Sequence, residues 1–108
     1  GKGTALMLHY VASKGAVVAM TRALARELAS IGVTVNAVAP GLILSDTVAE
    51  NPAITEFQSS AVMQARSIKR DAYPEDVVGA VSFLASDDSA FMSGQTLIVD
   101  GGSVFSTL

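Results

Sequence analysis

The chain has 108 residues, which suits one small domain, and a formal net charge of −3. Half of its residues are apolar and 16% are charged, a balance typical of the interior of a larger protein. The acidic balance argues against non-specific nucleic-acid binding, the lack of cysteine excludes disulfides, and a single histidine excludes a multi-histidine metal site within this chain. No apolar run reaches the roughly 18 residues of a membrane span. No signal peptide opens the chain, so we expect a cytoplasmic protein.

The opening residues, Gly1-Lys2-Gly3, match neither of the two common glycine-rich phosphate-binding patterns. The P-loop requires a hydroxyl directly after the lysine, and the dinucleotide pattern requires a glycine where Leu6 stands. We therefore interpret residues 1–9 as a flexible loop and the end of a strand. An opening without methionine suggests that the sequence belongs to a longer protein.

A helical period runs from about Leu8 to Ile31, and Gly32 follows it as a natural C-cap. Two stripes along this segment are expected to be covered, one by a sheet and the other by a partner subunit. The first stripe consists of larger side chains: Val17, Met20, Thr21, Leu24, Leu28 and Ile31. The second consists of small ones: Ala12, Gly15, Ala16, Ala19 and Ala23.

Tyr10 and Lys14 lie at the start of this segment, four residues apart, so a helix brings them to one face with Cβ atoms roughly 5–6 Å apart. A free tyrosine has a pKa of about 10 and is a poor base at neutral pH. A nearby ammonium favours the phenolate and lowers that pKa. The tyrosine can then give a proton to a carbonyl oxygen or take one from an alcohol. On these residues alone, a chance surface pair is the alternative interpretation.

Residues Val33 to Ala39 are β-branched and nearly uncharged, which predicts a strand buried on both faces. Asn36 is the polar exception, and we expect its side chain to bond to a neighbouring backbone. Pro40-Gly41 ends the strand. Open α/β sheets bind ligands just beyond the carboxyl ends of their strands, so this turn is either the edge of a site or an ordinary connection.

The segment from Leu42 to Asp71 is expected to leave the sheet and pack over the site. Asn51-Pro52 predicts the start of a helix that continues to about Ser67. Pro74-Glu75-Asp76 predicts another helix start, because proline suits the first turn and the acids suit the positive end of the helix dipole. The buried face of that helix should contain Val77, Ala80, Val81, Leu84 and Ala85.

Gln95 to Val99 predicts a second buried strand, and Asp100-Gly101-Gly102 a tight turn after it. The predicted order is therefore helix, strand, covering helix, helix, strand. Two strands do not make a stable sheet by themselves. We therefore expect residues 1–108 to be half of a single α/β domain whose remaining strands lie elsewhere.

Several of these segments together resemble the classical short-chain dehydrogenase/reductase family. Tyr10-Val11-Ala12-Ser13-Lys14 is similar to its Tyr-x-x-x-Lys motif, and the strand ending at Pro40-Gly41 to the strand and turn that follow that motif. The closing Val99-Asp100-Gly101-Gly102 also resembles its last strand and turn. The resemblance implies that residues 1–108 are the C-terminal half of a Rossmann-type domain with a doubly wound parallel sheet. The cofactor-binding N-terminal half is then absent, together with the family's serine and asparagine.

The same resemblance implies roles for individual residues. Tyr10 would exchange a proton with the substrate oxygen and, like Lys14, would contact the bound NAD or NADP. Lys14 would assist Tyr10 and bind the ribose of the cofactor. The Pro40-Gly41 turn would lie along the nicotinamide, and the backbone of Ile43 would bond to its carboxamide. Ser45 stands where relatives commonly have threonine, and its hydroxyl would also contact the cofactor. No residue is implied as a metal ligand.

The implied function is an NAD(P)-dependent oxidoreductase that interconverts a secondary alcohol and a ketone, similar to a 3-oxoacyl reductase. One alternative is a relative that uses the tyrosine and lysine for epimerisation or dehydration, and another is a non-catalytic assembly protein of the same fold. A homodimer or homotetramer is expected, assembled through the helix of residues 10–30 and the terminal strand. Nucleic acid and membrane are not expected as partners, and the sequence does not decide between NAD and NADP.

Overall fold

The computed structural model describes residues 2–41, 43 and 63–103, and within helix α1 only the backbone of residues 2–7 and of Tyr10. The described part contains two longer helices, two strands and three short helical turns. In chain order they are α1 (Lys2–Leu28), η1 (Ala29–Ile31), β1 (Ala37–Pro40), α4 (Met63–Ala65), α5 (Glu75–Leu84), η3 (Asp87–Ser89) and β2 (Thr96–Val99). This is the order that the sequence predicted.

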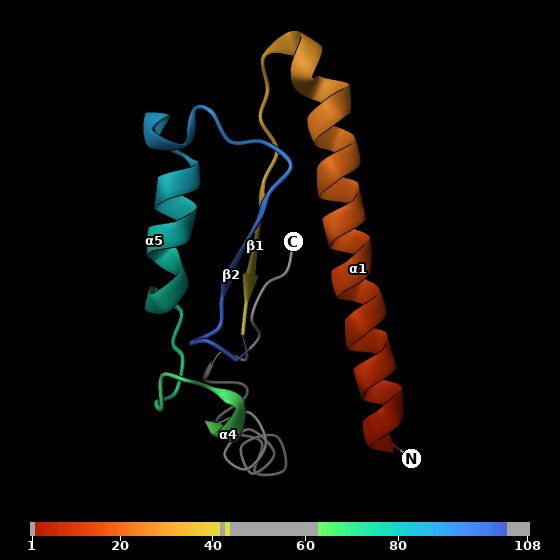
Figure 1. Ribbon diagram of the computed structural model, residues 1–108, viewed down its shortest axis with the longest axis vertical. Coiled ribbons are helices and arrows are strands. Elements are labelled where there is room, and N and C mark those ends of the chain that lie inside the picture. The colour runs from red at the N-terminus through yellow and green to blue at the C-terminus, as the bar shows by residue number, and fades with distance from the viewer. Residues whose placement is uncertain (1, 42, 44–62, 104–108) are drawn as a thin grey trace.

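The two strands lie side by side between α1 and α5 (Figure 1). They run parallel, with Ala37 opposite Thr96 and Pro40 opposite Val99. Parallel strands need a long crossover connection, and here the crossover contains α4 and α5. The described residues thus form an α/β arrangement with helices on both sides of a parallel sheet.

The strands are shorter than predicted, since β1 begins at Ala37 rather than Val33 and β2 begins at Thr96 rather than Gln95. Ala37, Val38 and Ala39 are only half-buried, as are all four residues of β2. Among the side chains that the structure describes, Ala25 is the only buried hydrophobic one. Full burial of both faces, as predicted for these strands, is therefore not reached within this chain.

Helix α1 begins earlier than predicted, because residues 2–9 continue the same helix instead of forming a loop. Its C-terminal end agrees with the prediction. The last turn tightens into η1, and Gly32 follows in the left-handed region with φ of 75°. The amide of Gly32 donates to the carbonyl of Ala29 at 3.0 Å, which closes the helix.

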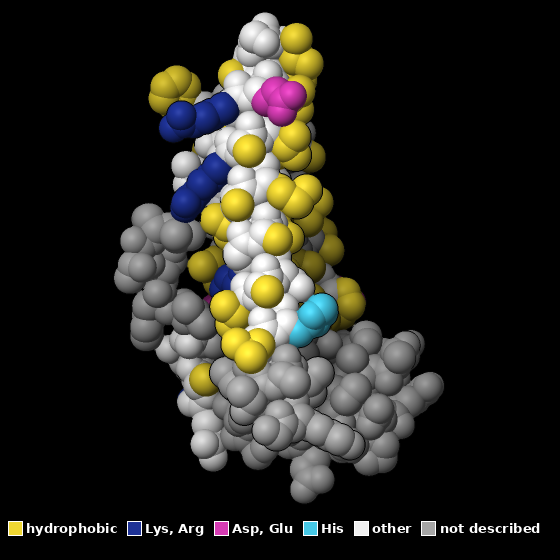
Figure 2. Space-filling model, turned by 90° about the vertical axis from the view of Figure 1, so that its right-hand side faces the viewer, with side chains coloured by type: hydrophobic (Ala, Val, Ile, Leu, Met, Phe, Trp, Pro, Cys, Tyr) yellow, Lys and Arg dark blue, Asp and Glu magenta, His cyan; other side chains and the backbone are white. Residues whose placement is uncertain are grey.

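The predicted buried stripe of α1 was partly wrong. Val17, Met20 and Ile31 are between 49% and 69% exposed, whereas Thr21 and Ala25 are buried. The covered stripe keeps Thr21 and Leu28 of the predicted one but has Val18 and Ala25 in place of Val17 and Leu24. It consists of Lys14, Val18, Thr21, Ala25 and Leu28, at helical spacings of three and four. The predicted stripe of small side chains is exposed in this chain, and Figure 2 shows the uncovered face of α1.

Asn36 performs the structural task that was predicted for it. Its Nδ2 donates to the carbonyl of Met92 at 3.2 Å, and its Oδ1 accepts from the amide of Gln95 at 3.1 Å. The amide of Gly94 also donates to the carbonyl of Val35 at 2.7 Å. These bonds connect residues 35–36 to residues 92–95, just before the two strands begin, and so set the register of the strand pairing.

The start of α5 is confirmed, with Glu75 and Asp76 in its first turn. The carboxylate of Asp76 also accepts from the amide of Tyr73 at 2.8 Å, which satisfies a donor that the helix itself leaves unbonded. Of the predicted buried face, Val77, Ala80 and Leu84 are half-buried. Val81 and Ala85 are exposed, so the covered stripe is narrower than predicted.

The helix predicted from Asn51 to about Ser67 lies mostly outside the described residues. Its described end contains α4, which stops at Ala65, two residues earlier than expected. Within residues 2–41, 43 and 63–103, no helix has the length and apolar character needed to cross a membrane.

Candidate functional site

The carboxyl ends of both strands and the N-terminal half of α1 lie at the same end of the molecule (Figure 1). This follows from chain direction, because α1 runs antiparallel to β1 and the two strands are parallel. Tyr10 and Lys14 belong to that half of α1, and Pro40 ends β1. The backbone of Tyr10, Lys14 and Pro40 therefore lies toward the edge where open α/β sheets bind ligands.

A groove of about 200 Å³ lies between α1 and β1 at this edge. Lys14 and Pro40 both line it, so the structure brings together two predicted site residues that are 26 positions apart. The other lining residues, which the sequence did not single out, are Ser13, Val17, Val18, Val38, Ala39 and Thr96. Lys14 is half-buried and is the cationic side chain of an otherwise mostly apolar wall.

The groove is smaller than the roughly 300–1,000 Å³ of a typical small-molecule site. Its size and its one-sided wall suit part of a site rather than a whole one. A lysine at the rim of an apolar wall is chemically suited to a flat ring with a polar sugar beside it. The residues present thus fit one side of a nicotinamide nucleotide.

The structure describes the remaining predicted site residues only in part. Tyr10 stands one helical turn before Lys14 in α1, but its side chain lies outside the described part of the chain. Ile43 is half-buried and pairs with Ala72 in an isolated parallel bridge. Ser45 lies outside the described residues.

The Pro40-Gly41 turn is held against the end of β2. The amide of Gly41 donates to the carbonyl of Val99 at 3.0 Å. A Cβ atom on Gly41 would stand 3.0 Å from the Cβ and 3.1 Å from the Cα of Asp100. A side chain at position 41 would therefore require Asp100 to shift by a few tenths of an ångström, which gives this turn a packing role that its sequence alone did not indicate.

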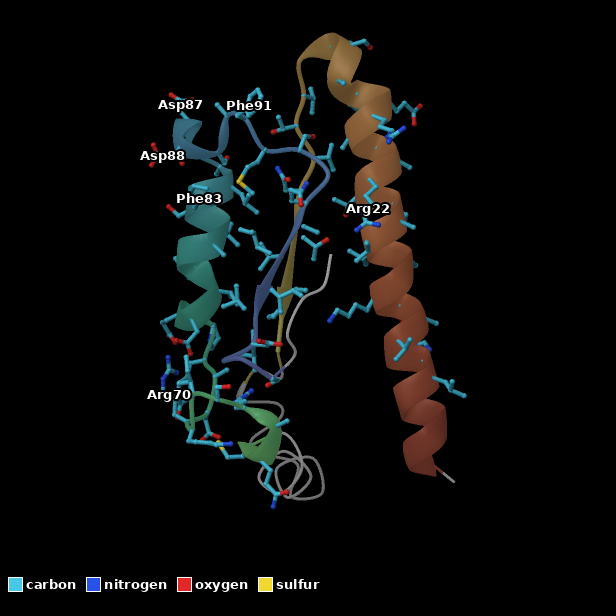
Figure 3. All side chains as sticks on the ribbon, viewed as in Figure 1. Arg22, Arg70, Phe83, Asp87, Asp88 and Phe91 are labelled. Atoms are coloured by element: carbon cyan, nitrogen blue, oxygen red, sulfur yellow. The ribbon has the colours of Figure 1, made fainter. Side chains whose placement is uncertain are left out.

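A second hollow of about 160 Å³ lies near the start of α5. Arg70 donates to Asp76 through both terminal nitrogens, at 2.7 and 2.8 Å, and lies beside the N-terminal end of α5 (Figure 3). These bonds, together with the one from Tyr73, hold the pKa of Asp76 well below its usual range. The same pairing raises the pKa of Arg70.

Both arginines that line this hollow bond to groups of the same segment. Arg66 is 4% exposed and donates to the carbonyl of Arg70 at 2.8 Å. Charged side chains that are bonded in this way stabilise a loop and a helix start. Across the part of the chain that the structure describes, no three carboxylate or histidine side chains are grouped so as to hold a metal ion.

Comparisons with known proteins agree with this geometry. The family model described as enoyl-(acyl carrier protein) reductase matches residues 2–104. The 3-oxoacyl-(acyl-carrier-protein) reductase FabG of Rickettsia felis is 45% identical over 94 residues, which are 87% of this chain and 38% of that protein. Nodulation protein G of Azospirillum brasilense is 45% identical over 101 residues, which are 94% of this chain and 40% of that protein.

Two solved structures have the same arrangement. A short-chain dehydrogenase/reductase from Brucella melitensis, described as glucose/ribitol dehydrogenase, has a TM-score of 0.77 and 37% identity over 91% of this chain and 38% of its own. A 4-hydroxyisoleucine dehydrogenase complexed with NADH has a TM-score of 0.72 and 28% identity over 88% of this chain and 39% of its own.

The parallel strands, the flanking helices and the groove at the carboxyl edge define part of a Rossmann-type α/β fold. The chain belongs to the short-chain dehydrogenase/reductase family. It spans between 38% and 40% of the length of the relatives named here.

Proposed function

We propose that this chain is the C-terminal half of an NAD(P)-dependent oxidoreductase that interconverts a secondary alcohol and a ketone, as 3-oxoacyl reductases do. The observation that carries the proposal is the groove that Lys14 and Pro40 both line, between α1 and β1. The names of relatives support the same chemistry, since they include a 3-oxoacyl reductase and a dehydrogenase in complex with NADH.

In this proposal Tyr10 gives a proton to the substrate oxygen in reduction and takes it back in oxidation. Lys14, four residues further along α1, favours the phenolate of Tyr10 and hydrogen-bonds the ribose. When bound, the nicotinamide supplies the hydride. Pro40, Gly41 and the backbone of Ile43 hold the nicotinamide along the end of β1, and the hydroxyl of Ser45 makes a further contact.

The residues that complete the site belong to the part of the domain that these 108 residues do not contain. The weak burial within this chain supports that view, because a core with one buried hydrophobic side chain needs further strands to cover it. We further propose a cytoplasmic enzyme that assembles as a homodimer or homotetramer through residues 10–30 and the terminal strand. The exposed small side chains of α1 support this assembly.

Replacing Tyr10 by phenylalanine in the full-length protein tests the proposed chemistry. Loss of a general acid–base group is expected to lower kcat roughly 10²–10⁴-fold, while the melting temperature and cofactor binding stay near those of the wild type. Tyr73→Phe is the matched control, because Tyr73 is the other tyrosine of the chain and lies outside the groove. Equal turnover of Tyr10→Phe and the wild type would refute the assignment.

A further inference from the structure

The turn of residues 100–103, at the end of β2, contacts two other chain segments, the end of β1 and the residues that follow α4. On one side Gly41 packs against Asp100 and bonds to Val99. On another side the carbonyl of Gly101 accepts from the amides of Ser67 and Ile68, at 3.0 and 2.9 Å. The turn therefore holds the point where the chain leaves β1 and the point just after α4.

The carboxylate of Asp100 shapes this turn. Its Oδ1 accepts from the amide of Gly102 at 3.0 Å and from the amide of Ser103 at 3.3 Å. The hydroxyl of Ser103 donates back to the carbonyl of Asp100 at 2.9 Å. Gly101 and Gly102 both have positive φ, of 67° and 79°, which glycine adopts without strain. Bent in this way, the turn directs the carbonyl of Gly101 to the two amides that it binds.

The turn also packs closely against Ser67. A Cβ atom on Gly102 would stand 2.9 Å from both Cβ and Oγ of Ser67, whose hydroxyl donates to the carbonyl of Gly102 at 3.3 Å. Movement of the turn must therefore move its neighbours as well. One of those neighbours is Gly41, which follows Pro40 at the rim of the groove.

Resting on the function proposed for this chain, we propose that Asp100 is a positioning residue for cofactor binding. It acts through Gly41: its carboxylate holds the turn against which Gly41 packs, and Pro40, the residue before Gly41, lines the cofactor groove. Asp100 does not itself line the groove. Its effect should therefore appear in the affinity for the nicotinamide nucleotide rather than in proton transfer.

Asp100→Ala and Asp100→Asn in the full-length protein test this inference, because asparagine keeps an Oδ1 acceptor and alanine does not. NADH and NADPH are titrated by the fluorescence of the bound reduced nicotinamide, and KM and kcat are measured for the nucleotide that binds. Asp100→Ala should raise Kd and KM about tenfold, the factor that corresponds to roughly 1.4 kcal/mol, with kcat changed less than twofold. Asp100→Asn should restore most of the affinity. Ser103→Ala, which removes a bond of the same turn but not the carboxylate, is the matched control.

The outcomes separate this inference from the proposed function. If the wild-type protein binds neither nucleotide, the proposed function fails. If the wild type binds and folded Asp100→Ala has the same Kd, the role of Asp100 is refuted. A lower melting temperature with an unchanged Kd for the folded fraction would show a purely structural turn, and would also overturn the inference. If Asp100→Ala does not fold, Asp100→Asn decides: affinity near that of the wild type supports the role of the acceptor, and a tenfold loss contradicts it.

Discussion

The side chains that fix this fold locally are mostly polar ones at the ends of elements. Asn36 joins the approaches to β1 and β2 by two bonds, and Asp76 caps α5 while pairing with Arg70. Sequence reasoning identified Asn36, because a single amide in a run of apolar residues needs backbone partners when it is covered. It placed Asp76 at the helix start but not in an ion pair, because a loop bend brings Arg70 back to it.

The pairing of Asp76 predicts a pH dependence of stability. Because folding lowers the pKa of Asp76, the folded state favours the charged form of this carboxylate. The resulting stabilisation is present above the unfolded pKa of about 3.9 and is lost as the pH falls toward the folded value. Asp76→Asn should therefore lower the melting temperature of the full-length protein at pH 7, and the difference from the wild type should shrink at pH 3.

Thermal unfolding followed by circular dichroism at both pH values measures this effect. The neighbouring exposed carboxylate provides the control variant Asp71→Asn, which should change little at either pH. A deficit of Asp76→Asn that stays constant between pH 7 and pH 3 would contradict an electrostatic origin.

At the scale of elements, α1 has one face that packs toward the sheet and another that is exposed. Its covered stripe, which includes Val18, Thr21 and Ala25, packs toward the sheet, and a Cβ atom on Gly94 would stand 3.5 Å from that of Ala25. Its other face exposes small and apolar side chains along the helix (Figure 2). Periodicity predicted the helix but only part of its covered stripe, because both faces are apolar and composition does not distinguish them.

Two substitutions to leucine on α1 separate the faces. Ala25→Leu inserts a larger side chain where Ala25 is 8% exposed, and such overpacking typically costs about 1–3 kcal/mol of stability. It should lower the denaturation midpoint of the full-length protein.

Ala19→Leu, on the exposed face, should instead disturb assembly if that face joins two copies. Sedimentation velocity measures the latter, and an unchanged sedimentation coefficient of Ala19→Leu would count against the interface.

The other end of the chain exposes apolar side chains as well. Phe91 is fully exposed, near Asp87 and Asp88 at the far end of α5 from Arg70 (Figure 3). Val78 and Val81 on α5 are also more than half exposed. Singly exposed apolar residues are common on protein surfaces, but exposure on α1, on α5 and at Phe91 together fits a chain that normally packs against more protein.

At the scale of the whole molecule, the described residues bury little core, and the function proposed here assigns them only part of the binding site. Titration of the isolated chain with NADH or NADPH in a calorimeter should therefore give no tight binding, whereas the full-length protein should bind one of them. The reason is that a groove of about 200 Å³ buries too little of a dinucleotide. A Kd for the isolated chain as low as that of the full-length protein would contradict the division of the site between two halves.

The sequence by itself determined the class of fold, the order of the elements and the candidate pair Tyr10 and Lys14. These depend on local periodicity, on caps such as Gly32 and on short motifs, all of which act within a few residues. Only the tertiary structure decided which face of α1 is covered, that Lys14 meets Pro40 in one groove, and that Asp100 supports Gly41. These depend on contacts between residues far apart in the chain, and neither spacing nor composition specifies how two backbones approach each other.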